Sequence, residues 1–565
     1  MTNGDFKDKV FLGDDVNTAL DEFASAFTHH IVPFLADWWT SSKPIPTVEE
    51  VLSIQQGIED RVNDNANLSG YENIPELLKR LALAMRFNRR NFVNIHPSPF
   101  LPSILSSLVV AIQNPNNIVE EVSKPTWEIE QQCISWIAQN LLQISSSQRP
   151  WGNVVSGGTL ANMTALLVAR DYTYDKLSRP RPGRIGPRGV IGSRSGIVLG
   201  TMGSHYSLEK ALWFLGIGHE NLIRVPVCWD EQVETKYQRE KRFIDGIQGE
   251  PWKSLILDGI ENDRKLGEQE LKSFYKGEQC PFSLQPLGSE ILKTIYSCFQ
   301  FDVPLIACVL TLGTTDTGTI ERLNTYVMNR LHEEDIFVHA DAASSGFAFI
   351  SDRVKSQLSF LENIDSFTVD AHKMGFLHYP CGVVIFKNEG FRHQIYHEAP
   401  YLGPLAPTLE GSRGGGGPAA LWMALQTIGI KQYTDWINHI LDFTACLVKG
   451  FEATNKYQVL HKVDLNMVAV APIPLIGETR NDINQLVRRI RERTLKGGEF
   501  LINLDRHLSG VKVRNNHQFN DTASDLVDIE ALRIVVTNPL VQLDDAQRLI
   551  NMLIRYLEEE RSSPK

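Results

Sequence analysis

Residues 369–375 of the chain are Val369-Asp370-Ala371-His372-Lys373-Met374-Gly375, at the end of a β-branched run that predicts a strand. In an open α/β sheet, functional side chains gather at the carboxyl edge of the parallel strands. A lysine held there, partly desolvated and beside an imidazole, can form a Schiff base with an aldehyde. The same residues also fit an ordinary surface lysine next to a structural histidine, so this stretch alone leaves both interpretations open.

Short β-branched runs alternate with helical stretches on both sides of this segment. Seven runs predict strands, at residues 153–155, 197–200, 222–227, 305–310, 336–339, 364–369 and 382–386. Strands that are separated by helices form a mostly parallel sheet with helices on both faces. The sequence therefore predicts an α/β fold.

The regions that flank this predicted sheet have different patterns. Before it, residues 14–146 show mainly helical apolar spacing. After it, strands at 467–471 and 531–537 and helices at 482–495 and 544–560 predict a small α+β domain. We divide the chain into an N-terminal helical segment (1–120), a large α/β domain (121–408) with a charged surface insertion at about 229–300, and a C-terminal domain (409–565).

The composition excludes several classes of protein. The 565 residues include 56 Lys and Arg against 67 Asp and Glu, a net charge of −11, which excludes a basic nucleic-acid binder and gives no sign of a membrane partner. The seven cysteines include no Cys-x-x-Cys pair, which argues against a disulfide framework and a zinc site. No leader or membrane-spanning run is evident, so we expect a soluble cytoplasmic protein without a bound metal.

Two more motifs follow predicted strands at the same sheet edge. Asp341, in His339-Ala340-Asp341-Ala342-Ala343, can pair with a pyridinium nitrogen, and Ala343 leaves room for a flat ring. An aspartate after a strand is also a common helix N-cap. The turn Ser156-Gly157-Gly158-Thr159 precedes a predicted helix, whose free N–H groups can hold a phosphate. An ordinary tight turn has the same composition.

An imidazole and a pair of hydroxyls complete the set of strand-end residues. His205, in Gly203-Ser204-His205-Tyr206-Ser207, can stack on a cofactor ring, although a lone histidine is more often structural. The stretch Thr311-Leu312-Gly313-Thr314-Thr315 supplies hydroxyl groups. Each motif by itself has an ordinary explanation, but their joint order, always after a strand, is hard to explain as coincidence and indicates one site.

These motifs resemble those of the group II pyridoxal-phosphate-dependent amino-acid decarboxylases. The matching segments are residues 156–162, 205–207, 312–318, 339–343, 370–375 and 409–413. The resemblance covers roughly residues 92–413. It implies the fold type I architecture with a seven-stranded large domain, pyridoxal 5′-phosphate as cofactor, and a homodimer. In that dimer the N-terminal segment wraps the partner and the active sites lie at the subunit interface.

The resemblance also implies roles for individual residues. Lys373 is expected to hold the cofactor as a Schiff base, Asp341 to pair with the pyridine nitrogen, and His205 to stack on the ring. The other expected cofactor-binding residues are Gly158, Thr159 and Asp370 at the phosphate, Thr315 and Ala343 close to the ring, His372 beside the lysine, and Ser412.

The same family places a proton-donating tyrosine on a loop after the lysine strand. Tyr401, in Ala399-Pro400-Tyr401, takes that place here, and Tyr396 is its rival. The segment at 92–99 only loosely matches the family's substrate loop, and it makes Phe92 and His96 the candidate substrate residues. Arg413 is expected to be structural or to lie at the subunit interface.

The expected reaction is decarboxylation of an L-amino acid to the corresponding amine and CO2. The segments 374–376 and 399–401 favour tyrosine or another aromatic amino acid, whereas 203–208 and 216–218 also resemble decarboxylases that convert aspartate to β-alanine or glutamate to γ-aminobutyrate. An acidic substrate needs an arginine or histidine in the pocket, and His96 is the candidate. The alternatives of another class are a carbon–carbon lyase on the same cofactor and a catalytically silent binding subunit.

Overall fold

The computed structural model describes residues 16–39, 43–64, 71–177, 196–225, 294, 298, 303–323, 325–395, 407–505, 513–514, 526–527 and 529–562. The two predicted proton donors, Tyr396 and Tyr401, lie outside the described residues. So does nearly all of the predicted insertion at 229–300.

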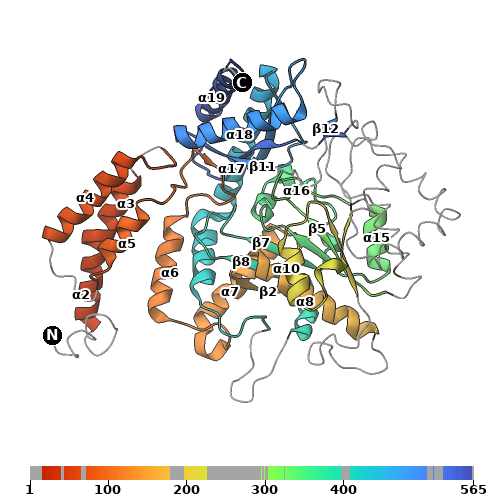
Figure 1. Ribbon diagram of the computed structural model, residues 1–565. Coiled ribbons are helices and arrows are strands. Elements are labelled where there is room, and N and C mark those ends of the chain that lie inside the picture. The colour runs from red at the N-terminus through yellow and green to blue at the C-terminus, as the bar shows by residue number, and fades with distance from the viewer. Residues whose placement is uncertain are drawn as a thin grey trace.

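The N-terminal part is helical, and Figure 1 shows its first helices as a group at the left of the molecule. They are α2 (Val16–Ala26), a π-helical turn (Phe27–Ile31), α3 (Val32–Trp39), α4 (Val48–Asp64) and α5 (Ile74–Leu81). This group has a small core of its own, formed by Phe34, Val51, Ile54, Ile58, Leu78 and Ala82. Helices α6 (Leu101–Gln113) and α7 (Glu120–Asn140) then lead to the large sheet.

The large sheet has seven strands, as the sequence predicts. They are β2 (Trp151–Val155), β3 (Ile197–Thr201), β4 (Leu222–Val225), β5 (Leu305–Thr311), β6 (Val338–Asp341), β7 (Ser366–Asp370) and β8 (Gly382–Phe386). Their order is β2-β8-β7-β6-β5-β3-β4, and only β8 runs antiparallel to its neighbours. The carboxyl ends of β2, β3, β5, β6 and β7 therefore lie at one edge.

Helices cover both faces of this sheet because successive strand residues point to opposite sides. Val155 and Val198 face one side, where they share a core with α8 (Gly158–Leu177) and α10 (Ser207–Phe214). Val154 and Ile197 face the other side, where the core includes α7 and α17 (Gly416–Thr454). Helices α15 (Thr325–Glu333) and α16 (Asp352–Lys355) also contribute to this second core.

A buried ion pair fixes α7 and β2 to the segment that precedes α17. Glu130 has a fully buried side chain and accepts a short hydrogen bond from the Arg413 guanidinium, whose side chain is 4% exposed. Glu130 also accepts from the Val154 N–H at 2.7 Å, and Arg413 donates to the Val154 carbonyl at 3.2 Å. These contacts give Arg413 a structural role.

The smaller sheet has the order β1-β11-β14-β10-β9 and lies near the C-terminal helices (Figure 1). Its strands are β1 (Asn91–Phe92), β9 (Tyr457–Val459), β10 (Met467–Pro472), β11 (Leu501–Asp505) and β14 (Ala531–Val535). Helices α18 (Arg480–Gly497) and α19 (Leu543–Ser562) accompany it, and β12 (Val513–Arg514) pairs separately with β13 (Leu526–Val527). β1 comes from the N-terminal segment and pairs in parallel with β11.

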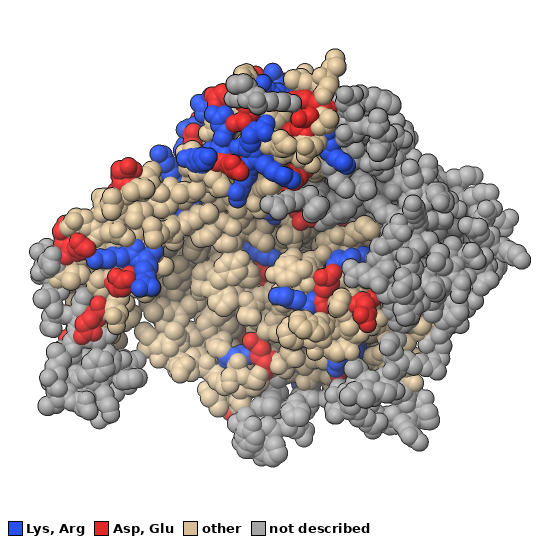
Figure 2. Space-filling model, viewed as in Figure 1, with Lys and Arg blue, Asp and Glu red and all other residues tan. Residues whose placement is uncertain are grey.

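Figure 2 shows positive and negative side chains side by side over α18 and α19. Three of the five arginines of α18 form ion pairs: Arg489 with Glu560 at 2.8 Å, Arg493 with Glu560 at 3.1 Å, and Arg488 with Glu530. Part of the positive charge of this helix is therefore compensated. Within the described ranges, no helix is long and apolar enough to cross a membrane.

Candidate active site

A cavity of about 340 Å³ opens at the carboxyl edge of the large sheet. It collects side chains from the ends of β5, β6 and β7, from the start of α8 and from the turn before α10. Nine of the predicted site residues line it: Gly158, Thr159, His205, Thr315, Asp341, Ala343, Asp370, His372 and Lys373. The structure thus brings together residues that the sequence separates by more than two hundred positions.

Three predicted residues do not line this cavity. Phe92 is 1% exposed and packs between the rings of Phe443 and Phe500, at centroid distances of 5.8 and 6.2 Å, in the core of the smaller sheet. This corrects its assignment as a substrate residue. Ser412 is exposed and accepts a hydrogen bond from Asn116 at 3.2 Å, so it too lies outside the cavity.

His96 stands behind the lining residue Tyr379 rather than in the cavity wall. The Tyr379 hydroxyl and His96 Nδ1 form a hydrogen bond of 3.3 Å, and the two rings meet edge to face with their centroids 4.9 Å apart. Burial, together with electrostatic repulsion from His372 and Lys373, lowers the pKa of His96 to about 4. His96 is therefore neutral at pH 7.

Asp341 is a buried carboxylate whose two oxygens both accept hydrogen bonds. It is 4% exposed. Its Oδ2 accepts from Asn162 Nδ2 at 2.8 Å, and its Oδ1 accepts from the Ala343 N–H at 3.1 Å. Since neither neighbour requires Asp341 to donate, the contacts favour its ionised form.

The orientation of Asn162 in turn fixes the protonation of His339. Because Asn162 Nδ2 donates to Asp341, the Oδ1 atom of Asn162 must accept a hydrogen bond. This oxygen lies 3.0 Å from His339 Nε2, so the network assigns a proton to that nitrogen. The Ser366 hydroxyl then donates to His339 Nδ1 at 2.8 Å. Burial lowers the pKa of His339 to about 4, consistent with a neutral ring.

His205 is held by a second branch of the same network. Asn162 Nδ2 also donates to Ser207 Oγ at 3.0 Å, and this hydroxyl donates to His205 Nδ1 at 2.9 Å. The Ser207 N–H points at the same nitrogen, at 3.3 Å. Burial lowers the pKa of His205, although the charge of Asp341 opposes the shift. His205 is thus a neutral, flat ring with its proton on Nε2.

Lys373 and His372 share one carboxylate oxygen. Lys373 Nζ lies 3.1 Å from Asp370 Oδ2, and His372 Nε2 lies 3.4 Å from the same atom. The Cys381 N–H donates to His372 Nδ1 at 3.2 Å, so the Nε2 of His372 carries the proton. Burial lowers the pKa of His372, although the charge of Asp370 opposes the shift. The ion pair with Asp370, three residues earlier in the chain, holds the Lys373 amine at the cavity.

Glycines let the start of α8 lie directly against Asp370. A Cβ at Gly158 would lie 2.9 Å from Asp370 Oδ2 and 3.0 Å from the Ala343 Cβ, and one at Gly382 would lie 2.7 Å from Asp370 Oδ1. This close approach brings the free N–H groups of the first helical turn to the cavity. Together with Thr159 they form a donor set that suits a phosphate.

The cavity as a whole fits the expected cofactor. Helix N–H groups suit its phosphate, the ionised Asp341 suits a protonated ring nitrogen, and the Lys373 amine suits its aldehyde. The neutral ring of His205 and the small side chain of Ala343 suit a flat aromatic ring. The described residues therefore satisfy the chemistry of pyridoxal phosphate.

Glu321 is a second buried carboxyl group near the site. It accepts from the Thr201 hydroxyl and, at 2.7 Å, from the Thr311 N–H, and so it joins the ends of β3 and β5. Burial, together with the charge of Asp341, raises the pKa of Glu321 to about 8, although the hydrogen bonds from Thr201 and Thr311 oppose the shift. Glu321 is therefore mostly protonated at neutral pH.

Sequence reasoning left four of these supporting residues without a role. Asn162, Ser207 and His339 stand inside the quoted motifs, so their positions were available as signals. Glu321 belongs to no motif that the sequence singled out. Glu321 is recognised only in the structure, where it is completely buried and interacts with the charge of Asp341.

Comparison with known proteins agrees with the geometry. A family profile described as the pyridoxal-dependent decarboxylase conserved domain matches residues 283–471. The chain is 22% identical to the L-2,4-diaminobutyrate decarboxylase of Acinetobacter baumannii, over 76% of this chain and 72% of that protein. It is 22% identical to the L-tyrosine/L-aspartate decarboxylase of Methanocaldococcus jannaschii, over 75% of this chain and 88% of that protein.

A solved structure extends the likeness to the whole fold. It is the glutamate decarboxylase domain of diaminobutyrate-pyruvate transaminase and L-2,4-diaminobutyrate decarboxylase from Vibrio parahaemolyticus. The TM-score is 0.71 at 18% identity, and the match covers 99% of this chain and 100% of that one. The architecture described above is therefore one already seen in experimental structures.

Replacing Gly158 by alanine is expected to weaken cofactor binding. The new Cβ would push against Asp370 and Ala343, and overpacking of this kind costs about 1–3 kcal/mol. We expect the apparent Kd for pyridoxal phosphate to rise about tenfold, measured by titrating the apoprotein and following the cofactor absorbance. Gly411→Ala is the matched control, because its Cβ would have no neighbour within 4 Å. An unchanged Kd in Gly158→Ala would contradict the close approach.

Glu321→Gln is expected to change how stability depends on pH. Because its pKa is raised, Glu321 keeps its proton in the folded chain between about pH 5 and 8, whereas it loses the proton in the unfolded chain. The free energy of unfolding therefore falls as the pH rises through this range. Glutamine cannot titrate, so the variant should gain stability relative to the native protein between pH 5 and pH 8. Urea unfolding at both pH values measures this gain. Glu220→Gln, on the exposed surface, should show none.

Proposed function

The chain belongs to the group II pyridoxal-phosphate-dependent decarboxylases, and from this membership we propose that its substrate is an aromatic L-amino acid, with tyrosine as the first choice. Decarboxylation yields the corresponding amine and CO2. The family establishes the type of reaction and the cofactor. The choice of substrate depends on the surroundings of the cavity.

A row of rings beside Lys373 supports an aromatic substrate. The ring of His372 lies 4.0 Å from that of Tyr379, Tyr379 lies 4.9 Å from His96, and His96 lies 4.5 Å from Phe87. Tyr379 lines the cavity and is 50% exposed, so it has a free face for another ring. Aromatic rings pair favourably at such distances.

The charges around the cavity also favour a substrate with an uncharged side chain. Among the described lining residues, Lys373 is the only lysine or arginine. His96, the expected partner for an acidic side chain, has a pKa of about 4, because burial disfavours its charged form. A side-chain carboxylate would therefore lack a cation in this part of the pocket. This absence is the observation that most favours the aromatic substrate.

The residues of the cavity would divide the catalytic work among them. Pyridoxal phosphate, when bound, accepts the electron pair that CO2 leaves behind. Lys373 would attach the cofactor, and Asp341, held by Asn162 and the Ala343 N–H, would keep a proton on its ring nitrogen. His205 would hold the ring flat, and the start of α8 would bind the phosphate. Tyr401, with Tyr396 as its rival, would return the proton to Cα.

An acidic amino acid is the second candidate substrate. It is favoured by the relative from Methanocaldococcus jannaschii, whose name includes both tyrosine and aspartate. For this chain, such a substrate would need a cation in addition to the described lining residues.

We also propose that the enzyme is a homodimer. Large apolar side chains are exposed along α6 and the helices before it, among them Leu52 at 60%, Leu101 at 74% and Leu105 at 62%. The surface over α6 carries few charged side chains in Figure 2. Apolar patches of this kind mark protein interfaces, and this one would suit a second copy of the chain.

Substrate choice is tested by giving the protein, loaded with pyridoxal phosphate, each amino acid separately and identifying the amine by mass. We expect tyramine or a related aromatic amine. β-Alanine or γ-aminobutyrate as the main product would contradict the aromatic assignment. Lys373→Ala is the control, and it should lower turnover by about 10²- to 10⁴-fold, since it removes the amine at the reacting centre.

The dimer is tested by sedimentation equilibrium of the native protein. The chain has a mass of 63.7 kDa, and we expect a species of twice that mass. The double variant Leu101→Glu/Leu105→Glu places charges on exposed positions of α6 and should shift the protein toward the monomer. A native protein that stays monomeric at micromolar concentration would exclude the proposal.

A further inference from the structure

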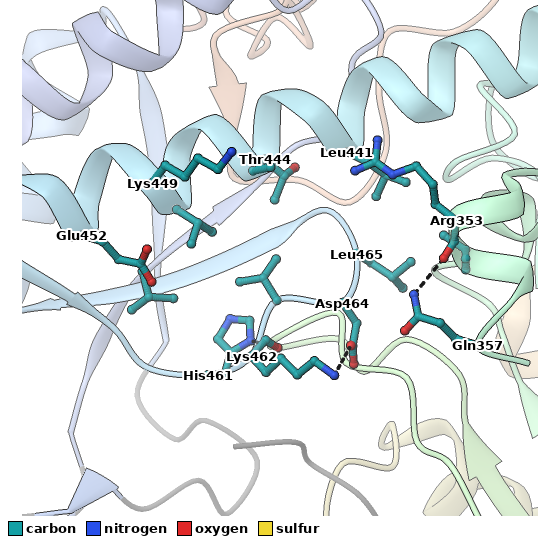
Figure 3. Close-up of a pocket in the computed structure, with 15 residues that line it drawn as sticks. Arg353, Gln357, Leu441, Thr444, Lys449, Glu452, His461, Lys462, Asp464 and Leu465 are labelled. Carbon is teal, nitrogen blue, oxygen red and sulfur yellow. Dashed lines mark hydrogen bonds and ion pairs between the residues drawn. The ribbon is translucent and has the colours of Figure 1, made fainter. Parts of the chain in front are cut away.

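A second cavity, of about 810 Å³, is lined by residues of the large domain and of the C-terminal region (Figure 3). It is open to solvent and is lined by α16, by the second half of α17 and by the turn between β9 and β10. It shares no described lining residue with the active-site cavity. Its volume is within the range of small-molecule sites in proteins, about 300–1,000 Å³.

The floor of this cavity is aliphatic. It is formed by Val354, Leu441, Ala445, Val448, Val459, Val463 and Leu465. Side chains of this kind come from both the large domain and the C-terminal region. An occupant of the floor would therefore be a hydrocarbon chain or a ring.

The buried polar groups in the wall already have partners within the protein. The Thr444 hydroxyl donates to the Ile440 carbonyl at 2.8 Å. His461 Nδ1 donates to the Lys462 carbonyl at 2.9 Å, and its Nε2 accepts from the Ala469 N–H. Asp464 accepts from Arg322 at 3.1 Å. An occupant therefore needs no hydrogen-bonding groups along its body.

The rim carries cations that are not fully compensated. Figure 3 shows Lys449 and Lys462 on opposite sides of the cavity. Lys449 makes no hydrogen bond or ion pair with the described part of the chain. Lys462 lies 3.8 Å from Asp464, a carboxylate that Arg322 already engages. Arg353 is paired with Asp442 at 2.6 Å.

We propose that this cavity binds an amphipathic monocarboxylate, with its apolar body on the aliphatic floor and its carboxylate at the ammonium group of Lys449. A single negative charge suits the rim best, because Glu452 at its edge offsets part of the positive charge. A cationic amphiphile would meet the ammonium groups of Lys449 and Lys462 and should bind more weakly for that reason.

The second cavity is lined by both the large domain and the C-terminal region. Asp464 accepts from the Ile320 N–H at 3.1 Å, and residue 320 ends the loop that carries Gly313 and Thr315 to the active site. A ligand on α16, α17 and the β9–β10 turn therefore binds only the folded arrangement of these elements. It should stabilise the protein by mass action.

The proposal is tested by isothermal titration of the enzyme, loaded with its cofactor, with decanoate. We expect saturable binding of one decanoate per chain and a rise in Tm. Lys449→Glu should weaken binding about tenfold, and Val448→Trp should abolish it by filling the floor from a half-buried position. Lys431→Glu is the matched control, because it lies on the same helix and outside the cavity, and it should bind as the native protein does.

Three outcomes would overturn the proposal. One is the absence of saturable decanoate binding by the native protein. Another is equal binding of decylamine, which has the same apolar body and the opposite charge. The third is unchanged decanoate binding in both Val448→Trp and Lys449→Glu, which would place decanoate on another apolar surface such as α6. Unchanged cofactor absorbance and tyrosine turnover in the variants show that the active site is intact.

Discussion

A negative charge buried at the end of β6 is the constraint on which the site depends. Asp341 is 4% exposed, and a buried carboxylate is stable only when its oxygens accept hydrogen bonds or face a cation. Asn162 on α8 supplies one of these bonds and is itself oriented by His339 on β6 and Ser207 on α10. One charge therefore couples the sheet to both helices on that face.

Much of the large domain could be predicted because its signals are local. Each parallel strand is a short buried run. A charged residue such as Asp341 or Lys373 stands at its end or just after it, and such residues are rare in an apolar core. The structure has all seven strands, with some bounds shifted. β6 begins at Val338 rather than 336, since Ile336 and Phe337 are core residues that precede the first strand pairing.

The rest depends on contacts that a sequence does not express. The role of Asn162 arises from atoms that lie 179 positions further along the chain, and Glu321 gains its raised pKa mainly from burial and also from the charge of Asp341. The assignment of Phe92 as a substrate residue was wrong because the sequence of the segment at 92–99 does not show which of its side chains point into the cavity. Ile95 reaches the cavity, while Phe92 enters another core. Strands as short as β1 and β9 have no periodicity to detect.

The pairing of β1 with β11 has a consequence for how the chain is made. Asn91 pairs with Leu501, so one strand of the smaller sheet leaves the ribosome about 400 residues before its partner. At a synthesis rate of roughly 5–20 residues per second, β1 waits for tens of seconds. The large domain is nearly complete by then, so β1 can pair only after most of the chain has been made, although it is made first. With only two residues, β1 offers little edge for wrong pairing during that interval.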